Sequence, residues 1–228
     1  MYPFYDWTML LILPALLLSF WAQHKVSSAF ARWSQVRTRA NLTGAQVAQR
    51  LLLTAGLPGV TVERTQGQLD DHYDPRAQVL RLSPGVAGVP SVAAAGIAAH
   101  EIGHAVQHRE AFVLFAARSA IVPVANIGSQ AAMPLFLLGL LFGSGFMMNL
   151  GIIAFSTAVA FQLVTLPVEL DASRRALALL RGSNILAADE LPGARAVLTA
   201  AAFTYLAATL MAVLQLLRLI VLRGSHDD

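Results

Sequence analysis

The sequence predicts a membrane α-helical protein with about four transmembrane helices and a small α+β portion, and three observations lead to this fold class. First, the 228-residue chain is 56% hydrophobic and 13% charged, with a mean hydropathy of +0.60, whereas soluble domains usually carry about 25% charged residues. Second, the charges leave long uncharged runs, and a helix needs about 20 apolar residues to cross the bilayer core. Third, arginines cluster beside these runs, which is typical of membrane topology signals.

The uncharged runs divide the chain into segments. They lie between Asp6 and His24, between Arg118 and Glu169, and over 197–217. The middle run is long enough for two spans, and "GSGFMMN" near its centre is typical of the turn between them. "MYPFYD" lacks the basic residues that begin a signal peptide, so we expect a retained anchor. The predicted segments are an N-terminal transmembrane anchor at 1–23, a cytoplasmic α+β region at 24–118, a transmembrane hairpin at 119–168, a cytoplasmic segment at 169–196, a C-terminal transmembrane helix at 197–222 and a tail at 223–228.

The region 24–118 contains local signals for helices and strands. Thr43 and Gln46 form the pattern of a capping box, and Ser91 is a good N-cap for the helix "VAAAGIAAHEIGHAVQ". "GVTVE" and "AQVLRL" are typical of short strands, and "DDHYDP" between them is typical of a turn. Because basic residues follow the first run, the positive-inside rule places this region in the cytoplasm. Two spans then lead out and back, so segment 169–196 lies on the same face.

The stretch "AAHEIGHAVQH" carries the chemistry of the sequence. His100 and His104 stand four residues apart, so both imidazoles lie on one face of a helix and can reach one metal ion, while Glu101 can contact a water on that ion. The metal would acidify the water, and the glutamate would take its proton and pass it to the leaving amine. Two ordinary surface histidines are the alternative, but the apolar flanks make unpartnered ionisable groups costly there.

The third ligand is a carboxylate or a histidine, because the chain has no cysteine. His108 lies one helical turn beyond the motif, but helical drift and distance favour a bystander. Glu169 in "TLPVELDASRRAL" comes directly where the third span emerges, with Ser173 four residues later on the same helical face. A solvated glutamate at a helix end is the other interpretation of Glu169.

Together, "AAHEIGHAVQH", "DHYDPRAQVLRLS" and "PVELDASRRAL" closely resemble the YugP-type membrane proteins, a family of neutral zinc metallopeptidases. The resemblance covers nearly the whole chain, and the chain is more distantly similar to the HtpX-type membrane peptidases. It implies a zincin-like catalytic portion with one Zn²⁺ at His100, His104 and Glu169, and Glu101 as the catalytic residue. In the HtpX-type pattern an aspartate supports a ligand histidine. Here Ser173 stands at that position and would orient the imidazole less strongly.

Other polar residues near the motifs are candidates for stabilising the oxyanion. The stretch "DHYDPRAQVLRLS" predicts a turn and an edge strand, and the strand could bind a peptide backbone by strand addition. The oxyanion candidates are His72 and Tyr73 from this stretch, and Arg174 and Arg175 one turn past Glu169. Asp171 lies two residues from Glu169 on a different helical face, so we do not expect it to replace the supporting aspartate.

The sequence thus predicts an integral membrane zinc endopeptidase of the plasma membrane, with its active site on the cytoplasmic side. An intramembrane protease is a weaker alternative, because no later span carries an aspartate that could be a ligand. A non-catalytic membrane scaffold with a structural zinc is the alternative from another class, but structural sites usually have four protein ligands. The expected partners are membrane lipid, a peptide or membrane-protein substrate and a membrane protein that brings it. The modest net charge of +3 argues against nucleic acid.

Overall fold

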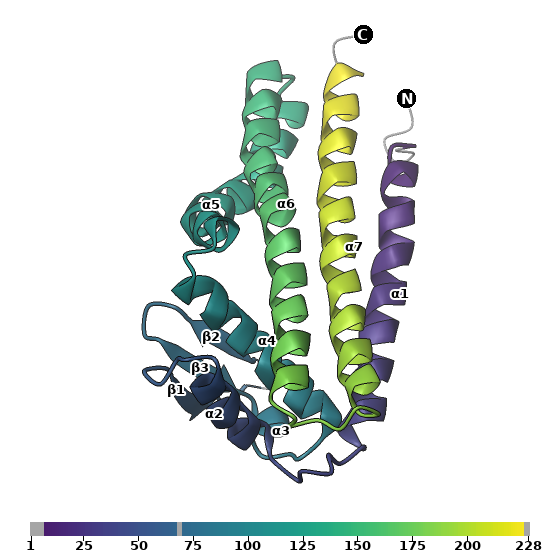
Figure 1. Ribbon diagram of the computed structural model, residues 1–228. Helices are drawn as coiled ribbons and strands as arrows, with labels where there is room; N and C mark the ends of the chain where they lie inside the picture. The colour runs from purple at the N-terminus through teal and green to yellow at the C-terminus, as the bar shows by residue number, and fades with distance from the viewer. Residues whose placement is uncertain (1–6, 68–69, 226–228) are drawn as a thin grey trace. The chain divides into compact units, whose positions relative to one another are not determined.

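The computed structural model of the chain describes residues 7–67 and 70–225 and is mostly helical (Figure 1). The first six residues of the predicted anchor and the last three of the predicted tail lie outside the described residues. Two compact units are formed, one from Met1–Ala22, Ala116–Pro167 and Thr204–Asp228, the other from Gln23–Phe115 and Val168–Phe203. The elements are α1 (Met9–Ser34), α2 (Gly44–Thr54), β1 (Thr61–Arg64), β2 (His72–Asp74), β3 (Val79–Leu82), α3 (Pro84–Ala87), α4 (Val92–Arg109), α5 (Val113–Leu141), α6 (Gly145–Gly182) and α7 (Leu191–Gly224).

The first unit is built from the apolar parts of the long helices. The helices α1, α5, α6 and α7 are each long and apolar enough to cross a membrane. Large apolar side chains on them are exposed, for example Ile127 at 72% and Phe146 at 73%. Helices satisfy their backbone hydrogen bonds internally, so such apolar surfaces are stable against lipid tails. These helices and the small sheet described below confirm the predicted fold class.

The turn between α5 and α6 lies in the stretch where the sequence predicts it. Gly143 adopts a φ of 66°, a left-handed conformation that glycine takes without steric cost. Beyond the turn the two helices come close together. A Cβ at Gly151 would lie 2.8 Å from the backbone oxygen of Ala132. Small residues therefore let these helices pack backbone to backbone, as is common in membranes.

The second unit contains a three-stranded sheet in the order β1–β3–β2. The strand β1 pairs with β3 in parallel, and β2 pairs with β3 antiparallel, with Tyr73 opposite Leu80. The predicted strands "GVTVE" and "AQVLRL" are confirmed, but β2 forms where the sequence predicts only a turn. The prediction that "AQVLRL" is an edge strand is wrong, because β1 and β2 pair with its two sides. The edges of the sheet are β1 and β2.

The helices α2 and α4 pack with the sheet into one hydrophobic core, which includes Leu51, Leu80 and Ile102 (Figure 1). The capping box of α2 is confirmed: the side chains of Thr43 and Gln46 each accept a bond from the other residue's backbone N–H. Ser91 caps α4 as predicted. The helix α4 is therefore fixed at its N-terminus and buried along most of its length. The two histidines of "HEIGH" thus project from a rigid element.

Candidate metal centre

Two helices come into backbone contact where the candidate ligands lie. Gly103, inside the "HEIGH" motif of α4, faces the backbone of α6 in the second unit. A Cβ at this position would lie 2.5 Å from the carbonyl oxygen of Ala172, much closer than real Cβ atoms approach. Only glycine therefore allows α6 to lie this close to α4. This close contact brings Glu169 within reach of both histidines.

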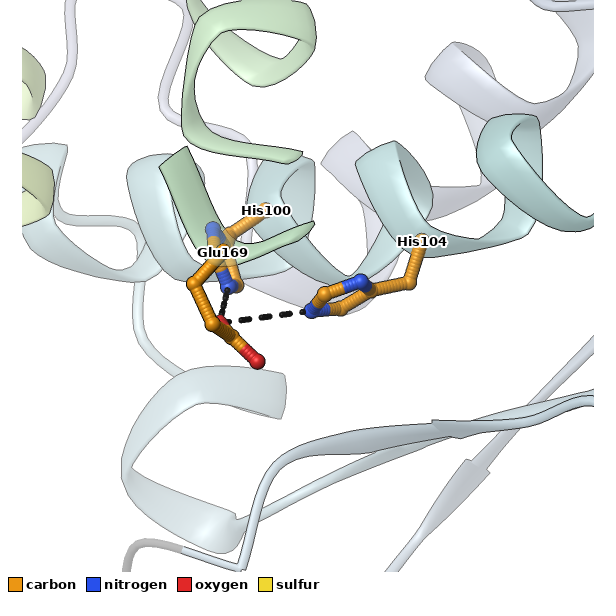
Figure 2. A group of neighbouring side chains, drawn as sticks. All are labelled: His100, His104 and Glu169. Carbon is orange, nitrogen blue, oxygen red and sulfur yellow. Dashed lines mark hydrogen bonds and ion pairs between the residues drawn. The ribbon is translucent and has the colours of Figure 1, made fainter. Parts of the chain in front are cut away.

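The side chains of His100, His104 and Glu169 converge on one point (Figure 2). Oε2 of Glu169 lies 3.1 Å from Nε2 of His100 and 3.6 Å from Nε2 of His104. One ligand atom from each residue lies within 4.8 Å of the others. Glu169 is 2% exposed and His104 is 7% exposed. A carboxylate so deeply buried requires cationic partners.

The donor atoms of this group fit a zinc ion. Zinc binds imidazole nitrogen and carboxylate oxygen at about 2.0–2.2 Å in tetrahedral geometry, which separates the ligand atoms by about 3.3 Å. The Nε2–Oε2 distances of 3.1 and 3.6 Å lie on either side of this value. Three protein ligands leave a fourth position for water or substrate, as catalytic zinc sites do. No second group of three such side chains occurs within residues 7–67 and 70–225.

Glu101 lies beside the three candidate ligands and is held by the edge strand. The backbone N–H of Tyr73 in β2 donates to Oε2 of Glu101 at 3.1 Å. Glu101 is 8% exposed, and this burial raises the pKa of its carboxyl above the usual value. A raised pKa is a property of carboxylates that take up a proton during a reaction. The sequence did not predict β2, and thus missed the backbone group that fixes this glutamate.

Each candidate histidine ligand has a polar partner at its other ring nitrogen. Oγ of Ser173 lies 3.2 Å from Nδ1 of His100. Oε1 of Gln107 lies 3.0 Å from Nδ1 of His104. Such partners fix the ring orientation and the tautomer of metal-binding histidines. The contact of Ser173 is the one expected from the sequence, whereas Gln107 was not singled out there.

A cluster of charged residues lies behind Gln107. Its side-chain amide donates to Oδ2 of Asp171 at 3.0 Å, and Asp171 in turn pairs with Arg174 and Arg175. Asp171 therefore does not contact His100, as expected, but it is connected to His104 through Gln107. One signal could have identified Gln107: it follows His104 by three residues and so lies on the same face of the helix.

The remaining predicted site residues are not drawn into the ligand group. His72 lies with Nδ1 3.0 Å from the backbone oxygen of Asp70. The hydroxyl of Tyr73 lies 2.9 Å from Nδ1 of His108, a histidine outside the group of three. His108 is the alternative third ligand, and the group of ligand atoms does not include it.

The two predicted arginines point to Asp171 instead of the ligands. Both Arg174 and Arg175 form ion pairs with its carboxylate, and Arg175 also pairs with Glu110 at the end of α4. A role for His72, Tyr73, Arg174 or Arg175 in stabilising an oxyanion stays a prediction. In the described contacts Arg174 pairs within α6, and Arg175 also joins α6 to the end of α4 through Glu110.

Fold and site together define a class of protein: a membrane protein with an HExxH helix and a candidate glutamate ligand from a later helix. The chain belongs to the family described as "Putative neutral zinc metallopeptidase", whose model matches residues 8–224. It is similar to "Putative membrane protease YugP" of Bacillus subtilis (strain 168), with 46% identity over 220 residues, which cover 96% of this chain and 98% of that protein. No solved structure matches the chain. The family predicted from the sequence and a membrane location are thereby confirmed.

Proposed function

We propose that the chain is an integral membrane zinc-dependent endopeptidase that hydrolyses peptide bonds with a metal-activated water. The observation that carries the proposal is the convergence of His100, His104 and Glu169 beside the buried carboxyl of Glu101. The membership in a zinc metallopeptidase family supports the same chemistry. The described residues contain a single group of three candidate metal ligands, which supports one zinc per chain. Three ligands and an adjacent base favour catalysis over the structural zinc of a scaffold.

The reaction divides among the residues of the site. When bound, zinc would acidify a water molecule and polarise the carbonyl of the scissile peptide bond. Glu101 accepts the proton of the attacking water and passes it to the nitrogen of the leaving amine. The Tyr73 N–H holds one carboxylate oxygen of Glu101, which leaves the other oxygen for this transfer. Ser173 and Gln107 keep the imidazoles in place.

The edge strand β2 supports a peptide as the substrate. The N–H of Tyr73 points to Glu101 and not to β3, so the outer edge of β2 faces Glu101. A peptide that lay along this edge would pass beside the site. A hollow of about 380 Å³ shares Tyr73 with this strand and is also lined by Gln78, Ala105 and His108 among others. A hollow of this size accommodates a substrate side chain.

The sidedness of the site is also part of the proposal. Lys25, Arg32, Arg37 and Arg39 follow the first apolar run, and such clusters lie on the cytoplasmic side of membrane proteins. We therefore place the metal site on the cytoplasmic face of the plasma membrane. There it can reach soluble peptides, exposed loops of membrane proteins, and substrates that a membrane partner delivers.

Cleavage of a labelled unfolded protein such as casein tests the proposal. The full chain is purified in detergent, and the wild type is compared with Glu101→Gln, Glu169→Ala and the surface control Glu63→Gln. We expect cleavage by the wild type and the control, and a loss of at least about 100-fold in the two site variants. Removal of metal should abolish cleavage, and added zinc should restore it. Cleavage that persists in Glu101→Gln would refute the assigned base. A wild type that binds zinc without cleaving any substrate would favour the scaffold.

A further inference from the structure

Gln107 is the most completely buried polar side chain near the candidate metal centre. It has no exposed surface and links three groups. Nε2 donates to the backbone oxygen of Val168 at 2.8 Å and to Oδ2 of Asp171 at 3.0 Å. Oε1 lies 3.0 Å from Nδ1 of His104. Every polar atom of this amide thus has a partner, as a buried amide requires.

The partners fix the direction in which the amide points. Val168 and Asp171 offer only oxygen acceptors, a carbonyl and a carboxylate, so the NH₂ end of Gln107 must face them. A flipped amide would place its oxygen against both of these acceptors. The Oε1 end therefore faces His104. Because an amide oxygen can only accept, Nδ1 of His104 must carry the hydrogen.

This hydrogen determines which nitrogen of His104 can bind a metal. With the hydrogen on Nδ1, the neutral imidazole has its lone pair on Nε2. Nε2 is the atom that faces Glu169 at 3.6 Å, inside the ligand group. The carboxylate of Asp171 on α6 thus orients the amide of Gln107, and this amide fixes the tautomer of His104 on α4.

The carboxylate at the end of this connection is itself held in place. Asp171 is 9% exposed and accepts hydrogen bonds from Arg174 and Arg175 as well as from Gln107. Arg175 also pairs with Glu110, the C-cap residue of α4. Two charge-assisted bonds therefore join α4 and its C-cap to α6, one from Gln107 to Asp171 and one from Arg175 to Glu110, and such bonds are about twice as strong as neutral ones.

We propose that Gln107 and Asp171 form a positioning relay that holds His104 in the tautomer and orientation in which Nε2 binds zinc. The proposal rests on the metal site of the proposed function, but it does not require peptidase activity. The relay acts on His104 and not on His100, because the two histidines have different partners at Nδ1. His100 has a serine hydroxyl at Nδ1, which can donate or accept, whereas His104 has an acceptor of fixed direction.

Two substitutions at the same position separate positioning from mere packing. Gln107→Met keeps the volume but removes both the acceptor for His104 and the donors to α6. Gln107→Glu keeps a carbonyl oxygen towards His104, and its O–H can donate to Asp171. Zinc affinity is measured by chelator competition on the detergent-purified full chain, together with the visible absorption spectrum of the cobalt-loaded protein. The unfolding temperature of the metal-free protein is recorded for each variant.

The relay predicts different results for the two variants. Gln107→Met should lose roughly 10- to 100-fold in zinc affinity and show an altered cobalt spectrum. Gln107→Glu should stay within a few-fold of the wild type and keep its spectrum. Unchanged zinc affinity in both variants would overturn the proposal, because packing alone would then explain the role of Gln107. An equal reduction in both would also overturn it, because the acceptor oxygen that glutamate keeps towards His104 would then make no difference.

A double-mutant cycle tests whether Asp171 acts through Gln107. Asp171→Ala should reduce zinc affinity about tenfold in the wild type, but not further in the Gln107→Met background. Asp189→Ala is the matched control, because Asp189 also pairs with an arginine, Arg39, and lies outside the ligand group. Additive losses in the cycle would overturn the relay.

The wild type separates the relay from the proposed function. If it binds zinc but cleaves nothing, the proposed function alone is refuted. If it binds no zinc, the proposed function and the relay are both overturned.

Discussion

Replacement of Gly103 by alanine should disable the metal site, although the nearest neighbours of the added methyl group belong to Ala172 and not to a candidate ligand. A Cβ at Gly103 would lie 2.5 Å from the oxygen of Ala172, whereas ordinary van der Waals contact begins at 3.4 Å. The nearest atoms are backbone atoms of Ala172 in α6, which cannot rotate away as a side chain can. The two backbones must therefore separate by about 0.9 Å. Glu169 lies one turn before Ala172 and would move with it.

A shift of this size exceeds what a zinc site tolerates, because ligand distances hold within about 0.2 Å. We expect Gly103→Ala to lower zinc affinity and cleavage by roughly 100-fold. Gly96→Ala on the same helix is the control, because its Cβ would lie 3.4 Å from the Cβ of Ala194. Both substitutions replace glycine by alanine inside α4, so both stabilise the helix by the same amount, about 1 kcal/mol. The assay is zinc affinity by chelator competition for both variants. Wild-type affinity in Gly103→Ala would refute the close-contact argument.

Three further predictions concern single side chains. Ser173→Ala should lower zinc affinity about tenfold, whereas Ser183→Ala should not, as chelator competition can show. Burial raises the pKa of Asp71 above 3.8 although Ser83 hydrogen-bonds to it. The folded state thus binds this proton more tightly, so its stability falls as the pH rises from about 3.8 through the raised pKa. Asp71→Asn should therefore gain unfolding temperature relative to the wild type between pH 3.5 and 7, and a constant difference would contradict this. Thr43→Ala should weaken the capping box by about 1 kcal/mol, which speeds hydrogen exchange at the start of α2 about fivefold; unchanged exchange would contradict the cap.

The features that depend on local sequence could be predicted. The long apolar runs require helices that span a membrane, because only internal hydrogen bonds satisfy a backbone in lipid. The spacing of His100 and His104 requires one helical face, and the caps at Thr43 and Ser91 follow from two short patterns. The resemblance to a family then pointed to Glu169, which lies far away in sequence.

The features that depend on packing could not be predicted. The strand β2 has only three residues, and His72 and Asp74 are strongly polar, so it lacks the apolar run that would predict a strand. It forms because Tyr73 pairs with Leu80 and is fixed by Glu101. The bond from Gln107 to Asp171 joins residues 64 positions apart. It exists only because α4 and α6 lie in backbone contact, which no local pattern encodes.

The zinc content of purified protein tests the central claim most directly. The wild type, Glu101→Gln and Glu169→Ala are purified in detergent, loaded with zinc, freed of excess metal and analysed for zinc per chain. We predict about one zinc in the wild type and in Glu101→Gln, because the base is not a ligand, and little zinc in Glu169→Ala. If Glu169→Ala holds zinc as tightly as the wild type, the third ligand is another residue, and the site described here is wrong.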